Sequence, residues 1–254
     1  MLRNPSSSRV LALGLVASTG LLLAACGSDG SDGTPSSSTS RQTTIATTTT
    51  TTTKATTTTS AAATSTSTPS SAQPETAVWP FASSSTRFSD PVAAARSFAV
   101  DYLGFVDPVV GAFQQGDSRS GEVPVQPEAK GPTTTVFVRM LGPDDSWWVL
   151  GSATASLHLT SPAALASIAS PVALSGRSTA FEATINIEVR QDGSTDPLAE
   201  AVAMGGSNGE MGPFSTSVPF DAPSASAGAI LLKTLSAKDG SVWEASVVRV
   251  AFAP

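Results

Sequence analysis

Residues 205–209, Gly-Gly-Ser-Asn-Gly, match the G-x-S-x-G pattern that surrounds the serine nucleophile of many hydrolases. The pattern works only on a sharp turn between a strand and a helix, with a histidine and an acid close by. Here Pro213 follows within a few residues, so a long helix cannot begin at this point. We therefore interpret residues 205–209 as a loop between strands.

The chain contains a single histidine, His158, which lies between two leucines. Such a residue is typical of an outward-facing position on a strand. A metal site would need further nitrogen or sulfur ligands, and the only cysteine, Cys26, lies far away at the N-terminal end of the chain. The sequence therefore predicts no metal and no cofactor.

Carboxylates are the remaining candidates for catalysis, because a pair of them can cleave a glycosidic bond. Residues 79–157 offer Asp117, Glu122, Asp144 and Asp145. Asp144 and Asp145 lie in a Gly-Pro-Asp-Asp turn, where acids are common for local reasons. We expect no enzyme, with an envelope hydrolase that uses these acids as an alternative.

Trp147 and Trp148 form the most informative aromatic pair in the chain. Neighbouring residues on a strand point to opposite faces of the sheet. One ring can fill the core, and the other must face solvent, a neighbouring domain or a ligand. Because exposed aromatic rings are favoured binding anchors, this pair is the candidate binding surface.

Residues 1–25 are expected to form a secretory signal peptide, since Arg3 and Arg9 precede an apolar run too short to span a membrane. The run ends in Leu-Ala-Ala-Cys-Gly at residues 23–27, which resembles the lipobox of bacterial lipoproteins. The resemblance implies that Cys26 carries diacylglycerol and, after cleavage, a fatty acyl chain such as palmitate. The predicted location is the extracytoplasmic face of the cell membrane. The alternative is an ordinary signal peptide that leaves a free thiol.

Residues 26–78 are expected to form a disordered tether. Between positions 35 and 74, 26 of 40 residues are Ser or Thr, so the segment cannot bury enough apolar surface to fold. Such tracts resemble O-glycosylated stalks, and an unmodified linker is the alternative.

Residues 79–157 are expected to form a small α+β domain. Ser89 or Asp90 can cap a helix that begins at Pro91 and ends at Gly104, with an apolar face at helical spacing. Strand-like runs follow at residues 109–113, 122–126, 133–141 and 146–153, separated by Gly, Pro and Asp turns. One helix on an antiparallel sheet satisfies this pattern.

Residues 158–254 are expected to form an all-β sandwich, after a break near residues 159–171. Residues 180–190 alternate between apolar and polar types, which predicts a strand with one buried and one wet face. An Asp192-Gly193 hairpin turn and four more strand-like runs complete about seven short strands. These runs are residues 198–204, 214–220, 229–235 and 243–252.

The same half of the chain carries turn prolines at Ser161-Pro162 and Ser170-Pro171, a Phe-Glu strand opening at residues 181–182, and a closing Asp239-Gly240 turn. In this order they resemble the immunoglobulin-like domain of bacterial spore-germination proteins. The resemblance implies a sandwich that binds or presents something. It transfers no catalytic residue.

The composition of the chain limits the kinds of molecule that it can bind. The formal net charge is −6, and only 13% of the 254 residues are charged, against about 25% in typical soluble domains. No basic stripe could neutralise phosphates, so nucleic acid is excluded as a partner. We expect a lipid-anchored, non-catalytic module that binds or scaffolds an envelope protein or polysaccharide. A carrier of a lipid or small ligand is a further alternative, which a large apolar cavity would favour.

Overall fold

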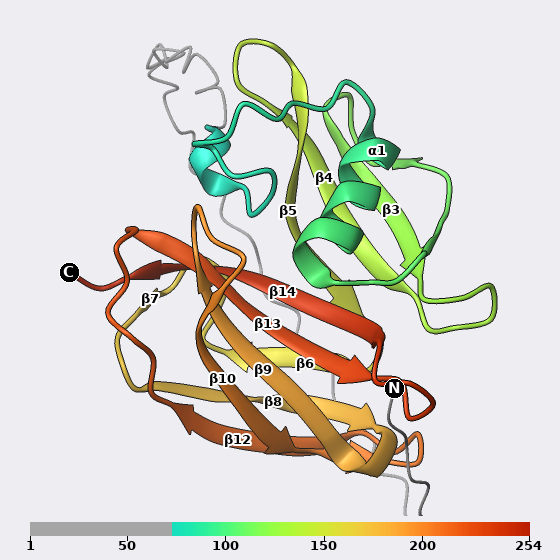
Figure 1. Ribbon diagram of the computed structural model, residues 1–254, viewed down its shortest axis with the longest axis vertical. Coiled ribbons are helices and arrows are strands. Elements are labelled where there is room, and N and C mark those ends of the chain that lie inside the picture. The colour runs from blue at the N-terminus through green and yellow to red at the C-terminus, as the bar shows by residue number, and fades with distance from the viewer. Residues whose placement is uncertain (1–72) are drawn as a thin grey trace, which may run out of the picture. The chain divides into compact units, whose positions relative to one another are not determined.

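The computed structural model describes residues 73–254 (Figure 1). The predicted signal peptide, the lipid attachment at Cys26 and nearly all of the predicted tether lie outside these residues. Within residues 73–254, no helix has the length and apolarity needed to cross a membrane.

The main helix begins where the sequence predicts. The backbone N–H of Ala93 donates a 2.7 Å hydrogen bond to Asp90 Oδ1, which caps α1 (Pro91–Ser97). The helix continues with π-type hydrogen bonds as η2 (Phe98–Leu103) and ends at Gly104, whose φ of 86° is left-handed. A short 3-10 turn, η1 (Pro74–Thr76), precedes it.

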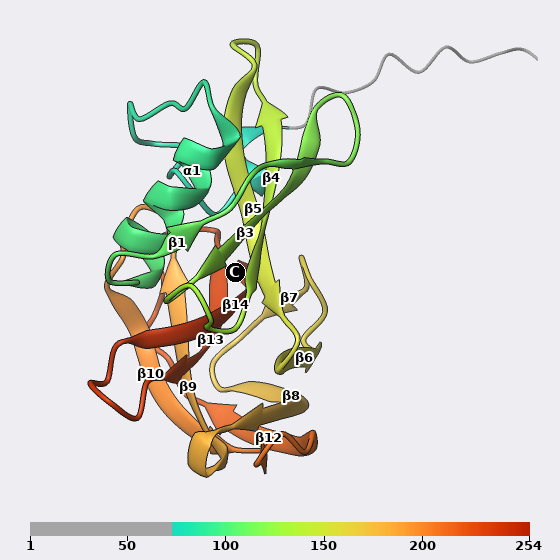
Figure 2. The same ribbon diagram turned by 90° about the vertical axis from the view of Figure 1, so that its right-hand side faces the viewer.

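The helix packs on one face of an antiparallel sheet (Figures 1 and 2). The strand order is β1-β3-β4-β5, and β2 pairs with β3. The expected strand at residues 109–113 is shorter than predicted, because only its first two residues pair with β3. The strands are β1 (Val109–Val110), β2 (Gln114–Gln115), β3 (Ser120–Gln126), β4 (Thr134–Leu141) and β5 (Ser146–Thr154).

The rest of the chain forms two facing sheets. One continues the first sheet beyond β5 in the order β14-β13-β9-β10, and the other contains β6, β8 and β12, with β11 at its end. The strands are β6 (Leu157–Ser161), β7 (Ser167–Ile168), β8 (Val172–Ala180), β9 (Thr184–Gln191), β10 (Pro197–Met204), β11 (Gly206–Ser207), β12 (Gly212–Val218), β13 (Ala227–Leu235) and β14 (Val242–Phe252).

The predicted fold class is confirmed: the described chain is mostly β, with one main helix, antiparallel sheets and a sandwich. Two local expectations need correction. The break expected at residues 159–171 contains strand pairing by β6 and β7. Residues 181–183 form the 3-10 turn η3 (Phe181–Ala183) instead of opening a strand, and Phe181 is exposed.

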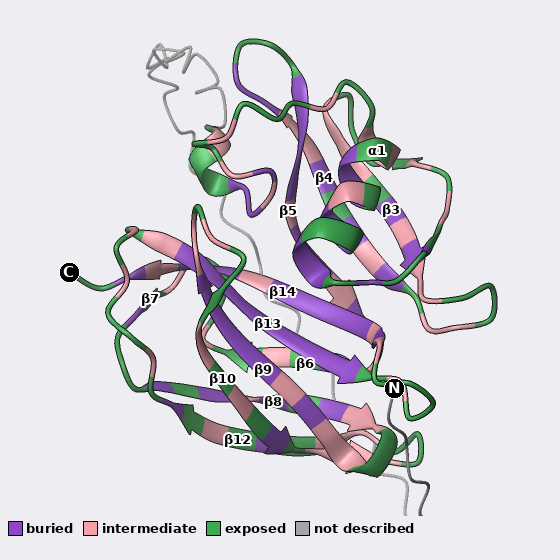
Figure 3. Cartoon of the chain, viewed as in Figure 1, coloured by how far each residue is buried: buried purple, intermediate pink, exposed green. Residues whose placement is uncertain are grey.

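The β13–β14 hairpin has an apolar core on each of its two faces. Leu231 and Ala245 contact the core beneath the helix, whereas Ile230 and Leu232 contact the core inside the sandwich. Most residues of both strands are therefore buried (Figure 3). A hairpin buried on both sides holds the helical part and the sandwich together.

The predicted wet face of residues 180–190 stays accessible in its first half and is buried in its second half. Glu188 and Arg190 lie under the end of the helix, and Arg190 donates a 2.5 Å hydrogen bond to the Tyr102 carbonyl. Glu188 also pairs with Arg190 and Lys233, so the buried charges satisfy one another. Burial raises the pKa of Tyr102 well above its usual range.

Candidate functional site

Both rings of the predicted binding pair are buried. Trp147 packs into the core beneath the helix, with its ring edge-on to Phe113 at a centroid distance of 5.1 Å. Trp148 points to the other face and is 1% exposed, because Ala77 packs against it and the Arg87 guanidinium lies 4.8 Å from its ring centroid. Of the three options for the second ring, solvent, a neighbouring domain or a ligand, none applies, because residues 77–87 of the chain cover it.

The predicted acids occupy turns and make local bonds. Asp117 Oδ1 accepts a 2.7 Å hydrogen bond from the Arg119 backbone, which lowers the pKa of Asp117. Asp144 Oδ2 accepts a 2.6 Å bond from Ser146, which lowers the pKa of Asp144. The general acid of a glycosidase needs a raised pKa, whereas the pKa values of these two carboxyls are lowered. Neither carboxyl is therefore suited to that role.

The remaining predicted acids also lie at the sheet surface. Asp145 forms a 2.6 Å ion pair with Arg119. Glu122 lies on β3 opposite Phe137 of β4. No group of three His, Cys, Asp or Glu residues that could hold a metal ion occurs in residues 73–254.

The G-x-S-x-G segment has a packing role. Residues 206–207 form β11, which pairs with β8, and β12 begins at Gly212 with no helix between. A Cβ added at Gly206 would lie 2.2 Å from the Gly212 nitrogen. The glycines therefore allow two backbones to approach closely, and the expected loop contains a short strand.

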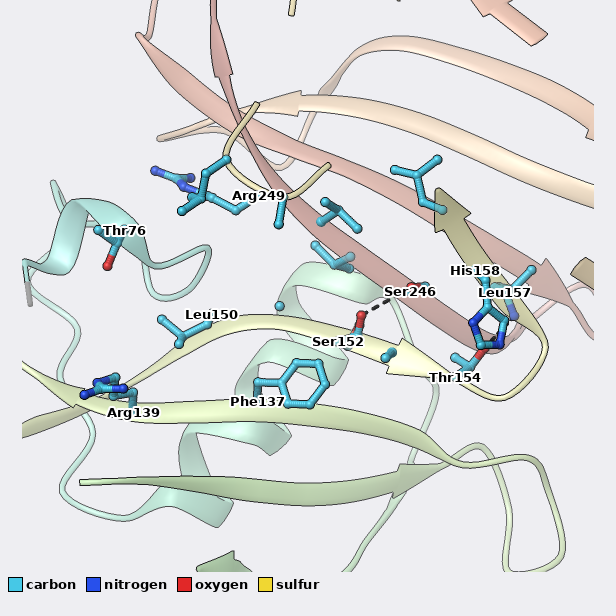
Figure 4. A pocket seen from close by; sticks show the side chains of 17 residues that line it. Thr76, Phe137, Arg139, Leu150, Ser152, Thr154, Leu157, His158, Ser246 and Arg249 are labelled. Atoms are coloured by element: carbon cyan, nitrogen blue, oxygen red, sulfur yellow. Dashed lines mark hydrogen bonds between the residues drawn. The ribbon is translucent and has the colours of Figure 1, made fainter. Parts of the chain in front are cut away.

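A cavity lies on the face of β4 and β5 that points away from the helix (Figure 4). It has a volume of about 600 Å³, which is within the range of ligand pockets. Its floor is the seam between β5 and β14, and β6 and the loop before β7 form its far side. We call it the seam groove; it is lined by Thr76, Phe137, Arg139, Leu150, Gly151, Ser152, Ala153, Thr154, Leu157, His158, Leu159, Ala164, Leu165, Ser246, Val247, Val248 and Arg249.

The groove exists because β5 and β14 meet over a very short length. Ser152 and Val247 are the only residues of these two strands that pair directly. The seam carries small residues, and Gly151 allows the close approach, since an added Cβ would lie 2.5 Å from the Val247 carbonyl oxygen. Ser152 Oγ donates a 2.9 Å hydrogen bond to the Ala245 carbonyl. The groove therefore lies over small residues at the seam, and larger residues of β4, β6 and the loop before β7 surround it.

Apolar side chains reach the surface at the rim of the groove. Phe137 is 36% exposed and Leu165 is 66% exposed. Leu165 has a left-handed backbone, with φ of 65°, which leucine rarely adopts. A 2.7 Å hydrogen bond from its N–H to the Arg249 carbonyl holds it there. A strained, exposed leucine beside an apolar cavity is an observation that points to ligand contact.

Three ionisable side chains line the groove, and all three are basic. Arg249 pairs with both carboxylate oxygens of Asp192, one at 2.6 Å, and donates to the Glu75 carbonyl at 2.5 Å. His158 is exposed on β6, as predicted for an outward strand position, and its Nε2 lies 3.0 Å from the Ala155 carbonyl. Arg139 extends from β4 at the opposite end (Figure 4).

Sequence reasoning missed this groove, although one pattern bore on it. In residues 134–141, Val136 and Val138 alternate with Phe137 and Arg139, so the latter two share the face away from the helix. The apolar Phe137 on that face could have been noticed. The contribution of β14, more than 90 residues later in the chain, could not.

Comparison with protein families supports the immunoglobulin-like resemblance of the C-terminal part of the chain. A family model described as the immunoglobulin-like domain of bacterial spore germination matches residues 156–241. This agrees with the predicted resemblance and with the sandwich of β6 to β14. Searches of curated proteins and of solved structures found no match. The matched domain is of a non-catalytic fold type, and it indicates a binding or scaffold module.

Proposed function

We propose that this protein is a lipid-anchored, non-catalytic binding protein on the extracytoplasmic face of the cell membrane. The lipobox-like residues 23–27 and the Ser- and Thr-rich segment after them support the anchor and the tether. The immunoglobulin-like match and the sandwich support a binding module.

The ligand that the geometry favours is a small apolar molecule held in the seam groove. The single observation that carries this proposal is the groove itself, with Leu150, Leu159 and Val248 among its lining and Phe137 and Leu165 at its rim. Exposing such a surface without a ligand is unfavourable in water. This is the carrier alternative of the sequence analysis.

An apolar segment of an envelope protein is the second candidate ligand. Leu165 and Phe137 remain exposed at the rim, so a chain could lie across them. A polysaccharide is less well supported, because both Trp147 and Trp148, the aromatic anchors expected for sugar rings, are buried.

The anchor is tested by cell fractionation. The Cys26→Ser variant is expected to leave the membrane fraction, because its single lipid attachment point is lost. Retention of the variant at the wild-type level would contradict lipid anchoring.

Ligand binding is tested with a neutral, environment-sensitive dye such as Nile red, on the full mature chain carrying Cys26→Ser. We expect saturable fluorescence enhancement, weakened about fivefold by Phe137→Ser through loss of apolar contact. Phe181→Ser is the matched control, since Phe181 is also an exposed phenylalanine but does not line the groove. If Phe137→Ser binds the dye as tightly as Phe181→Ser does, the dye binds outside the seam groove.

A further inference from the structure

We propose that the seam groove takes a single-chain amphiphile with an apolar tail and an oxyanion head, and that Arg139 binds the head. The inference rests on the proposed function and adds the chemistry of the ligand to it. It comes from three features of the groove: its charge, the unpaired state of Arg139, and the arrangement of polar and apolar lining.

The charge of the groove is opposite in sign to that of the protein. The chain carries 20 acidic residues against 14 Lys and Arg, yet no carboxylate lines the groove. Its ionisable residues are Arg139, His158 and Arg249. A carboxylate-free basic lining on an acidic protein favours an anion over a cation or a second acidic surface.

Arg139 supplies the uncompensated charge. The guanidinium groups of Arg87, Arg119, Arg190 and Arg249 each pair with a carboxylate. Arg139 is only partly exposed and forms no ion pair or side-chain hydrogen bond with any residue in positions 73–254.

No carboxylate neutralises Arg139 within the groove. Glu122 lines an adjoining depression that Arg139 also borders, and Asp117 lies in the turn before β3. The positive charge of Arg139 helps to lower the pKa of Asp117, but the two groups form no ion pair. The donors of the guanidinium therefore stay available to a ligand, and a guanidinium can bind a carboxylate or phosphate with two parallel hydrogen bonds.

The lining places the two parts of an amphiphile at different points. Arg139 lies at one end of the groove, beside Leu150 and Phe137 (Figure 4). From there the lining continues along Gly151 and Ser152 toward Thr154 and Leu157, which gives a methylene chain a surface to lie on. An oxyanion at Arg139 would direct the tail along this seam, where apolar side chains exclude water and strengthen the ion pair.

The test compares ligands that share one tail and differ in the head. Dodecanoate, dodecyl phosphate and 1-dodecanol compete with Nile red for the full mature chain carrying Cys26→Ser, which removes the protein's own acyl groups as competitors. We expect the anions to bind at least about tenfold more tightly than dodecanol, as charge-assisted hydrogen bonds require. The stronger of the two anions identifies whether the head is a carboxylate or a phosphate.

Two variants assign the preference to the proposed residue. Arg139→Gln should bring the anions to the affinity of dodecanol and leave dodecanol binding unchanged, whereas Arg139→Lys should keep part of the preference. Arg96→Gln is the control, because it removes the same charge from an exposed helix position that does not line the groove. Circular dichroism checks that each variant is folded.

The outcomes separate this inference from the proposed function. Equal binding of dodecanol and the anions by the wild-type groove would overturn the anionic head and leave an apolar binding protein. An anion preference that survives Arg139→Gln would overturn the role of Arg139. Failure of the dye and of all three amphiphiles to bind would overturn both proposals.

Discussion

Gly151→Ala tests whether the seam between β5 and β14 depends on close backbone approach. The added Cβ would lie 2.5 Å from the Val247 carbonyl oxygen, closer than real contacts of this kind. The neighbouring β14 cannot retreat freely, because both of its faces are packed against apolar cores. The substitution must therefore push the two strands apart.

The expected loss can be worked out from the contacts at the seam. Inserting a methyl group into a tightly packed site costs about 1–3 kcal/mol. Parting the strands also weakens the bonds from Ser152 Oγ to the Ala245 carbonyl and from Ser246 Oγ to the Ser152 carbonyl, at 2.9 and 3.3 Å. Each such bond contributes about 1 kcal/mol. We expect Gly151→Ala to lower the free energy of unfolding by roughly 2–4 kcal/mol.

Urea unfolding, followed by tryptophan fluorescence, measures this free energy. Gly240→Ala is the matched control: Gly240 also has a positive φ, of 75°, but nothing lies within 4 Å of an added Cβ. Its cost is the backbone strain alone, about 1 kcal/mol. If Gly151→Ala is no more destabilising than Gly240→Ala, the close approach at the seam is refuted.

Three further predictions concern single contacts. Leu165→Asn should weaken Nile red binding yet leave thermal stability equal or higher, because asparagine tolerates the left-handed backbone; a lower melting temperature would contradict this. Glu188→Gln leaves buried Arg190 without its carboxylate and should cost about 3 kcal/mol in urea unfolding, so a loss below about 1 kcal/mol would show that the pair is solvated. The ionised form of Asp144 is favoured on folding, so its contribution is present at neutral pH and lost as the pH falls through its lowered pKa. Ser146→Ala should raise that pKa, and an unchanged NMR titration of Asp144 would contradict the hydrogen bond as the cause.

Local patterns predicted the elements that local chemistry controls. Pro91 and a cap at Ser89 or Asp90 predicted the start of the helix, and Gly104 predicted its end, because capping and left-handed backbone depend on neighbouring residues. The hairpin at Gly193 and the turn at Gly240 were found for the same reason. The strand β8 was missed, since its Ser- and Gly-containing sequence lacks a strong β signature.

The tryptophan pair shows where alternation stops being informative. It correctly placed Trp147 and Trp148 on opposite faces of β5. It could not say that Ala77 and Arg87, about 60 to 70 residues earlier in the chain, cover Trp148. Alternation tells which residues share a face, but the element that packs on that face comes from elsewhere in the chain.

By itself, the sequence determined the mostly β fold with one helix, the immunoglobulin-like resemblance and the expectation of a lipid anchor at Cys26. Each of these depends on residue types within short windows. Only the tertiary structure decided that Glu188 and Arg190 are buried and that Phe137 and Arg139 border a groove. The burial and the groove both arise where segments far apart in the sequence pack together. Which face of a strand is covered depends on this packing, and the pattern of residues along the strand does not reveal it.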